Sequence, residues 1–175
     1  MEYSEYSNIV LSAPLQQLKD EHVSLRTDMD YIYDIAEEIE FDSGPAVGQL
    51  FATLHKLVSA FTVALKKHAK REEEGLFPML ARRLGGDDRT IEVMEFEHEK
   101  AERHLLNFLN EADQVGLTMD ENDAQAITIY AIQAHATLTQ HFAKEEKMLF
   151  PLAETVLSAI EKAELERLLK ALSSI

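Results

Sequence analysis

The chain contains no cysteine among its 175 residues, which excludes disulfide bonds, thiolate zinc sites and cysteine nucleophiles. Glycine and proline are also scarce, with six and four residues, and they stand where helices are expected to end or kink. No segment alternates apolar and polar residues over the length of a strand, so nothing indicates a β-sheet. We therefore expect an all-helical chain.

Basic residues are few as well. Seventeen Lys and Arg face 32 Asp and Glu, which gives a formal net charge of −15. Nucleic acids are polyanions and need basic patches, so a nucleic-acid surface is not expected, and an anionic membrane would be repelled too. No apolar run approaches the roughly 20 residues that span a bilayer. The first ten residues carry Glu2 and Glu5 and no basic stretch, so they do not read as a secretory signal, and we expect a cytoplasmic location.

Apolar residues at helical spacing predict four long helices and a short fifth one. The predicted helices run from about Pro14 to Glu40, from Pro45 to the Gly85-Gly86 pair, from Asp87 or Asp88 to Gly116, from Thr118 onward, and from Ser158 to about Leu172. Ser12 is expected to cap the first, and capping boxes at Thr118-Met-Asp-Glu121 and Ser158-Ala-Ile-Glu161 to open the last two. Short turns predict an antiparallel up-down four-helix bundle with a short C-terminal fifth helix. It forms a single domain over residues 1–175, with the bundle core at about 14–157.

One sequence block occurs twice. Residues 68–80 read HAKREEEGLFPML and residues 141–153 read HFAKEEKMLFPLA, with six identical positions in thirteen. A Glu-His pair precedes each block, as Glu21-His22 and as Glu97-His98. The chain thus reads as two helical hairpins, each with an isolated His and a His-x-x-x-Glu motif. An approximate two-fold axis would place the two half-sites face to face.

The spacing within each motif suits metal binding. Helical residues four apart differ by about 40° around the axis and about 6 Å along it, so His68 projects beside Glu72, and His141 beside Glu145. Burying two ionised carboxylates without compensation costs several kcal/mol each, and a pair of dications removes that cost. Nitrogen and oxygen ligands without sulfur suit iron or manganese, and zinc less specifically. The predicted core ligands are His22, His68, Glu72, His98, His141 and Glu145.

Each of these residues also has a simpler interpretation. A single His on an apolar stripe is more often a hydrogen-bonded core residue, and a single His-x-x-x-Glu is more often a surface pair. Both patterns occur twice here at matched positions, which favours metal binding over a metal-free structural bundle. Pro78 and Pro151 follow the two motifs, and they either kink their helices beyond the site or end the regular helix.

Neighbouring residues are assigned less directly. Glu102 stands four residues after His98 and is kept as a seventh candidate ligand, with a supporting or a solvated role as alternatives. Glu73 and Glu146 follow the ligand glutamates and are expected to support the site from outside or to face solvent. His55, His104 and His135 are expected to point away from the site. Tyr33 and Tyr130 are expected to pack in the core, three turns from the site.

The twin His-x-x-x-Glu-Glu-x-x-Leu-Phe-Pro blocks, with the two Glu-His pairs, resemble the hemerythrin-like, or HHE cation-binding, family. The resemblance covers the first to the fourth helix and implies an antiparallel four-helix bundle with an oxo- or hydroxo-bridged di-iron centre, in which the six core residues are ligands and both glutamates are bridges. Oxygen-carrying hemerythrins of marine invertebrates have a second His where this chain has Glu102. Their fourth-helix acid stands at i+5, whereas this chain has Glu at both i+4 and i+5. These departures disfavour reversible oxygen carriage and favour the roles of bacterial relatives in sensing oxygen, nitric oxide or peroxide and in iron handling.

Two functional hypotheses follow. The first is a di-iron protein that binds or senses oxygen or nitric oxide, or handles iron under oxidative or nitrosative stress. The alternative is a di-iron enzyme that reduces peroxide or nitric oxide, or donates iron for the repair of iron centres. A ferritin-like oxidase needs two Glu-x-x-His motifs, and only Glu95-Phe-Glu-His98 matches. The expected partners are a small gaseous ligand or peroxide and an unidentified redox partner, and a homodimer is left open.

Overall fold

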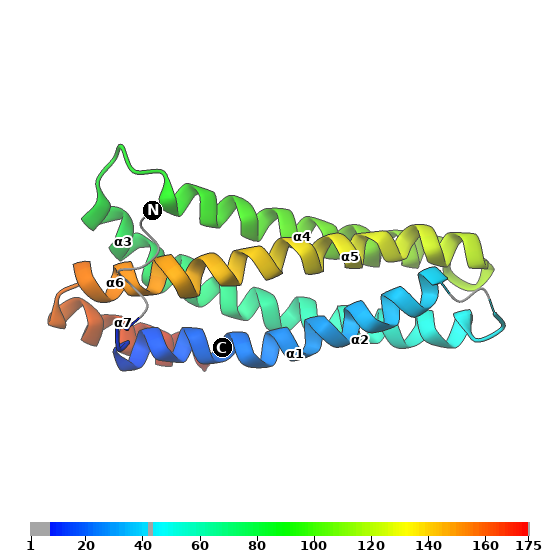
Figure 1. Ribbon diagram of the computed structural model, residues 1–175, viewed down its shortest axis with the longest axis horizontal. Coiled ribbons are helices and arrows are strands. Elements are labelled where there is room, and N and C mark those ends of the chain that lie inside the picture. The colour runs from blue at the N-terminus through cyan, green and yellow to red at the C-terminus, as the bar shows by residue number, and fades with distance from the viewer. Residues whose placement is uncertain (1–7, 42–43, 175) are drawn as a thin grey trace. The chain divides into compact units, whose positions relative to one another are not determined.

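A computed structural model describes residues 8–41 and 44–174, which are helical with short connections and contain no strand (Figure 1). The elements are α1 Ala13–Phe41, α2 Val47–Arg71, the π-helical turn η1 Glu72–Leu76, α3 Phe77–Leu84, α4 Thr90–Val115, the 3-10 turn η2 Gly116–Thr118, α5 Glu121–Lys144, the π-helical turn η3 Glu145–Leu149, α6 Phe150–Val156 and α7 Ala159–Ser173. The all-helical prediction is confirmed. Parts of the N-terminal stretch and of the first turn, residues 1–7 and 42–43, lie outside the described residues.

Residue contacts divide the described chain into two compact units. Unit 1 comprises residues 8–24, 66–97 and 140–174, and unit 2 comprises residues 25–41, 44–65 and 98–139. Helices α1, α2, α4 and α5 contribute to both units, whereas α3, α6 and α7 lie wholly in unit 1. The single domain expected over the whole chain stays a prediction.

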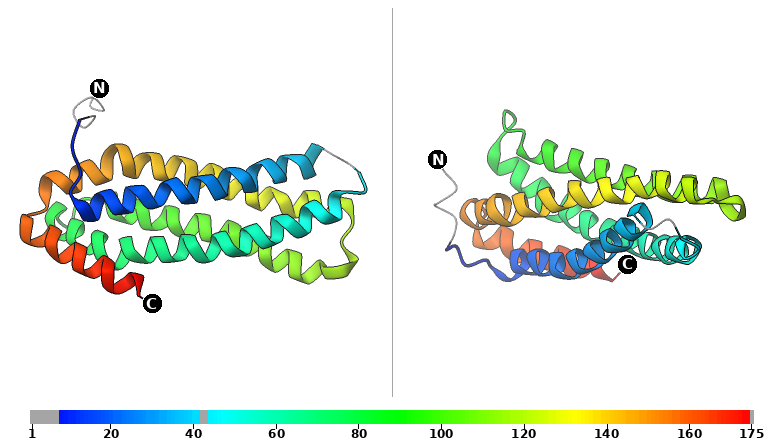
Figure 2. Two further views of the ribbon diagram at one scale, coloured as in Figure 1. Left: turned by 90° about the horizontal axis from the view of Figure 1, so that it is seen from below. Right: turned by 45° about the vertical axis from the view of Figure 1, so that its right-hand side comes forward.

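The repeated Leu-Phe-Pro motifs build the core of unit 1. Leu76 and Phe77 come from the first repeat and Leu149 and Phe150 from the second, and all four are buried in one apolar cluster. The other fully buried leucines of this cluster are Leu15, Leu18, Leu80, Leu165 and Leu169. The last two come from α7, which turns back from the end of α6 (Figure 2) and extends the core beyond the expected limit at residue 157.

Each proline of the repeats starts a new helical segment. Pro78 lies in the first turn of α3, directly after η1. The N–H of Phe77 donates to the carbonyl of Glu72, five residues earlier, which is the π-helical pattern. This wider turn accommodates a proline, which has no N–H and whose ring clashes with the carbonyl four residues back in an α-helix. Pro151 follows η3 in the same way, and because helical structure continues past both prolines, neither ends its helix.

One of the two predicted capping boxes is present. In α7 the N–H of Glu161 donates to Ser158 Oγ at 3.2 Å, and the N–H of Ser158 donates to Glu161 Oε2 at 2.8 Å. The box predicted from Thr118 is wrong, because the chain continues to Thr118 as the 3-10 turn η2. Asp120 and Asp123 exchange the corresponding bonds at the start of α5, at 2.9 and 3.2 Å.

The side chain of Ser12 does not cap α1. Within the described residues its Oγ forms no hydrogen bond with a backbone N–H of α1. The backbone N–H of Ser12 instead donates to Glu154 Oε2 in α6 at 2.8 Å, and Lys162 of α7 donates to the other Glu154 oxygen at 2.7 Å. At the start of α4, Asp88 Oδ1 accepts from the N–H of Thr90 at 2.8 Å, in line with the predicted cap.

Segments of α1, α2, α4 and α5 run side by side within unit 2 (Figures 1 and 2). In its interior the rings of Phe51 and Phe108 stack with centroids 5.4 Å apart. Tyr33 and Tyr130, expected as core packing, are only half-buried. The hydroxyl of each donates to a glutamate at 2.7 Å, so both lie at the edge of the core and not within it.

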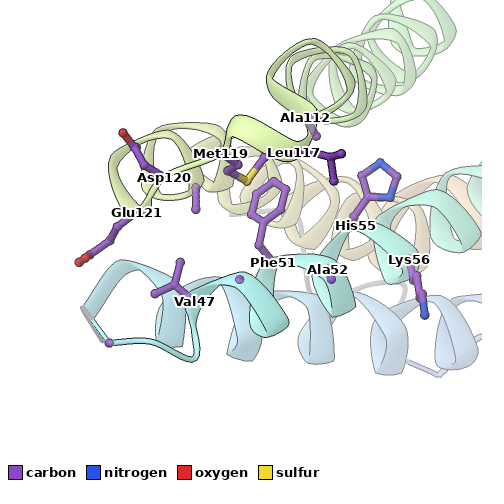
Figure 3. Close-up of a pocket in the computed structure, with 14 residues that line it drawn as sticks. Val47, Phe51, Ala52, His55, Lys56, Ala112, Leu117, Met119, Asp120 and Glu121 are labelled. Carbon is purple, nitrogen blue, oxygen red and sulfur yellow. The ribbon is translucent and has the colours of Figure 1, made fainter.

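Unit 2 also contains a mainly apolar cavity of about 710 Å³. Figure 3 shows Phe51 and Met119 within it, with His55 at one side and Glu121 at the other. None of the predicted metal ligands lines this cavity.

The helical run Val47–Leu84 is long and apolar enough to cross a membrane, judged by length and composition alone. This finding differs from the expectation that no apolar segment would be long enough to span a bilayer. A single run of this kind is weak evidence for a membrane span, because core helices with an apolar buried face pass the same test.

Candidate metal centre

Five of the predicted ligands converge inside unit 1. His22 comes from α1, His68 from the last turn of α2 and His141 from α5. Glu72 and Glu145 are the first residues of the two π-helical turns. All five side chains are buried, with at most 1% of any residue exposed. The repeat thus places each ligand glutamate where a regular helix gives way to a wider turn.

Four of these residues offer ligand atoms that all lie within 4.8 Å of one another. His22 Nε2 lies 3.1 Å from His68 Nε2 and 3.0 Å from Glu145 Oε2. His68 Nε2 lies 3.1 Å from Glu72 Oε1. Two donors held at right angles, each about 2.1 Å from one ion, are about 3 Å apart. The observed spacings therefore fit ligands of a single metal ion.

The carboxylates of Glu72 and Glu145 also belong to a second such group, which contains His141. His141 Nε2 lies 3.0 Å from Glu145 Oε1, whereas the other Glu145 oxygen faces His22. Each oxygen of this carboxylate thus faces a different imidazole. A carboxylate that bridges two metal ions requires this arrangement.

A second ring of carboxylates holds the outer nitrogens of the three imidazoles. The Nδ1 contacts are His68 with Glu21 at 2.6 Å, His141 with Glu97 at 2.9 Å, and His22 with Glu146 at 2.9 Å. An ionised carboxylate only accepts hydrogen bonds, so in a neutral imidazole Nδ1 carries the proton. The lone pair of Nε2 then points into the centre, as metal ligation requires.

Each of two outer carboxylates is in turn held by a cation from the matching repeat position. Arg71 donates to Glu21, and Lys144 donates to Glu97. Burial raises the pKa of Glu21, but the hydrogen bonds from His68 and Arg71 outweigh it and lower the pKa below its usual value. The pKa of Glu97 is lowered in the same way. Burial raises the pKa of Glu97, but the hydrogen bonds from Lys144 and His141 outweigh this effect.

The sequence contained a signal for these supports that motif reading missed. The two Glu-His pairs were recognised as echoes of each other, yet only their histidines were assigned a role. Each glutamate of a pair reaches the histidine of the following repeat block and not its own neighbour. The matched cation three residues after each block histidine, Arg71 and Lys144, marks the partner.

The imidazoles compensate the buried carboxylates when no cation is present. Burial lowers the pKa of His68, but attraction by Glu72 and the hydrogen bond with Glu21 outweigh it and raise the pKa to about 10. Burial also lowers the pKa of His22, and its bonds with Glu145 and Glu146 reverse the direction and raise it. The Nε2 atoms of the two rings lie 3.1 Å apart, so protons on both atoms would repel each other. A metal ion would take the place of these protons.

Four further candidate residues lie on α4 or next to the two central glutamates. His98 is buried in α4, directly after Glu97, and is the first residue of the second segment of unit 2. Glu102 is half-buried and belongs to neither group of closely spaced ligand atoms. Glu146 contacts His22 from outside, which is one of its two expected roles, and Glu73 is half-buried. Ligation by His98 and by Glu102 stays a prediction.

Two of the discounted histidines have partners elsewhere in unit 2. His55 Nε2 lies 3.3 Å from Asp113 Oδ1, and His135 Nε2 lies 3.0 Å from Asp30 Oδ1. His104 is half-buried, and burial together with nearby cations lowers its pKa. None of the three belongs to the groups of closely spaced ligand atoms.

Buried imidazoles and carboxylates on an all-helical scaffold define a helical cation-binding domain. The chain belongs to the hemerythrin family, because the model of the hemerythrin HHE cation binding domain matches residues 13–153. The match includes every predicted ligand, and it confirms the resemblance drawn from the repeats. Among curated proteins, none matches this chain.

Proposed function

We propose that the protein binds two iron ions at this centre, with manganese or zinc as substitutes. The main support for this proposal is the position of the Glu145 carboxylate. One of its oxygens lies 3.0 Å from His22 Nε2, and the other lies 3.0 Å from His141 Nε2. In this proposal Glu72 is the second bridge, and His22 and His68 hold one ion. His141 holds the other together with His98, which directly follows the Glu97 that contacts His141.

The donor set supports iron over the alternatives. It consists of imidazole nitrogens and carboxylate oxygens and contains no sulfur, a combination that suits iron and manganese. The two buried bridging carboxylates neutralise half of the charge of two divalent ions. The excess positive charge favours an additional anionic or electron-rich ligand.

Aromatic rings from unit 1 make the surroundings of the centre apolar. The ring of Phe142 stacks on His22 with centroids 4.2 Å apart, and Phe150 lies 5.6 Å from the same imidazole. Both phenylalanines are fully buried. Such walls exclude bulk water from the centre.

From this chemistry we infer that the protein binds or senses oxygen or nitric oxide, or handles iron under oxidative or nitrosative stress. Iron bound by these residues would supply electrons and a position for the small ligand. The chain fixes the imidazoles through Glu21, Glu97 and Glu146, keeps their Nε2 atoms deprotonated toward the ions, and excludes water. The antiparallel up-down bundle is part of the same proposal, since short connections join successive long helices.

Metal content and optical spectra test this proposal. Protein purified without added metal is expected to carry about two iron ions per chain, and its absorption should change reversibly with reductant and with nitric oxide. Glu72→Gln should lose most of the metal. His55→Ala is the matched control, because His55 pairs with Asp113 away from the ligand groups, and it should keep the metal. A metal-free protein with full stability in chelator would contradict the proposal, whereas sustained peroxide turnover would favour the enzyme alternative.

A further inference from the structure

Two hydrogen-bonded triads support the centre from matching positions of the repeat. We call Glu21, His68 and Arg71 the Arg71 triad, and Glu97, His141 and Lys144 the Lys144 triad. In each triad an outer carboxylate contacts the Nδ1 of a ligand imidazole and a cation contacts the carboxylate. The triads are alike in topology and differ in the chemistry of the cation.

The Arg71 triad is held by a two-point contact. Arg71 Nε lies 2.9 and 3.2 Å from the two oxygens of Glu21, and Arg71 Nη2 lies 2.9 Å from Oε2. The guanidinium side chain is only 14% exposed. A planar guanidinium that donates to both oxygens fixes the plane of the carboxylate, because both contacts must bend for it to rotate. The carboxylate in turn contacts His68 Nδ1 at 2.6 Å.

The Lys144 triad is held at a single point. The ammonium of Lys144 donates to one oxygen of Glu97, and the other oxygen lies 2.9 Å from His141 Nδ1. The lysine side chain is 44% exposed. An exposed ammonium on a flexible stem is hydrated and screened, so it restrains the carboxylate less than a buried guanidinium does.

Neither the bordering surface hollows nor the exposure of the outer carboxylates separates the two triads. Glu21 borders a surface hollow of about 580 Å³, and Lys144 borders another of about 470 Å³. Both outer carboxylates are also similarly covered, at 20% and 16% exposed. The type of cation and its exposure therefore distinguish the Arg71 triad from the Lys144 triad.

We propose that Glu21 and Glu97 are positioning residues of unequal strength, so that the metal ion on the His141 side is released and exchanged before the ion on the His68 side. This inference rests on the proposed two-ion centre. A ligand imidazole whose outer carboxylate can rotate leaves its ion more readily, since the outer contact sets both the direction and the basicity of Nε2. The Lys144 triad is thus the labile half of the centre, where an ion enters and leaves.

The test measures metal release from the loaded full-length protein into excess chelator by stopped-flow absorption. The wild-type protein should release its iron in two phases. Lys144→Arg should slow the fast phase, and Arg71→Lys should accelerate the slow phase, each by about two- to fivefold. The double variant with both exchanges should again show two phases. Arg83→Lys is the matched control, because Arg83 makes a similar two-point contact with Glu161 of α7 and should change neither phase.

Charge removal assigns the phases to the two halves. Glu97→Gln should weaken binding of one ion by roughly 10- to 100-fold and affect the fast phase, whereas Glu21→Gln should affect the slow phase. If Arg71→Lys proves unstable, the rate of the fast phase in Lys144→Arg tests the inference by itself, because this variant only exchanges one exposed cation for another. A single release phase in the wild type, or an unchanged fast phase in Lys144→Arg, would overturn the inference. Protein that binds no iron at all would overturn the two-ion proposal itself, which keeps the two failures apart.

Discussion

The proposed bridging role of Glu145 makes a specific prediction for thermal stability. Replacing it with Gln keeps the shape of the side chain and removes the charge that faces two imidazoles, each at 3.0 Å. An ion that binds only the folded protein stabilises it by about 2.7 kcal/mol at a free concentration one hundred times its dissociation constant. Two such ions contribute about 5 kcal/mol. In a chain of this length about 1 kcal/mol moves Tm by 2–4 °C, so chelator should lower Tm of the wild type by roughly 10–20 °C.

The assay compares Tm with and without chelator within each variant. This difference cancels any effect of the substitution on the metal-free protein, where Glu145 also contacts His22. In Glu145→Gln the chelator-dependent difference should almost vanish, because both ions of the proposed centre would lose a ligand. Glu146→Gln is the control one residue further on. It removes the outer contact of His22, and a 10- to 100-fold loss of affinity for one ion should reduce the difference by only about 3–9 °C. Equal losses in the two variants would refute the bridging role.

Three further outcomes concern the scaffold. Gly75→Ala should destabilise the protein by about 1 kcal/mol or more in a chemical denaturation series, because its Cβ would lie 3.2 Å from Leu165 Cδ1 in a closed core. Gly48→Ala, with nothing within 4 Å, should instead stabilise it by roughly 0.5–1 kcal/mol, and equal effects would argue against the packing explanation. Leu165→Ala should cost about 2–5 kcal/mol in the same series if α7 is part of the core, and a neutral result would show that α7 is not. The pKa of Glu161 is lowered to about 2 by its bond with Arg83, so its contribution to stability is present above about pH 4.3 and is lost as pH falls toward 2. Glu161→Gln should remove that part of the acid dependence in a pH series of unfolding, and an unchanged profile would contradict the assigned role of this pair.

Several features of the fold were predictable because they depend on local chemistry. The all-helical composition follows from apolar spacing and from the scarcity of glycine and proline. The Ser158 box was predictable, since a hydroxyl and a carboxylate three residues apart satisfy each other's backbone groups. The box at Thr118 failed because two aspartates slightly further on compete for the same bonds. Sequence spacing alone does not decide such a competition.

The prolines show a second limit. The sequence indicated that Pro78 and Pro151 disturb their helices, but it left two outcomes open. The structure shows a π-helical turn before each proline, with the ligand glutamate as its first residue. That choice depends on how Leu76 and Leu149 are buried in the core of unit 1, which a local pattern does not contain.

The sequence by itself determined the types of the candidate ligands, their doubling and the pairing of each block histidine with its glutamate, because these depend on helical spacing and on the repeated block. Only the tertiary structure decided which side chains meet across helices. It turned each Glu145 oxygen toward a different imidazole, joined Glu21 to His68, and left a guanidinium on one side and an ammonium on the other. Contacts between residues far apart in the chain depend on packing directions that no single helix encodes. The difference between the two halves of the centre therefore became visible only in the folded chain.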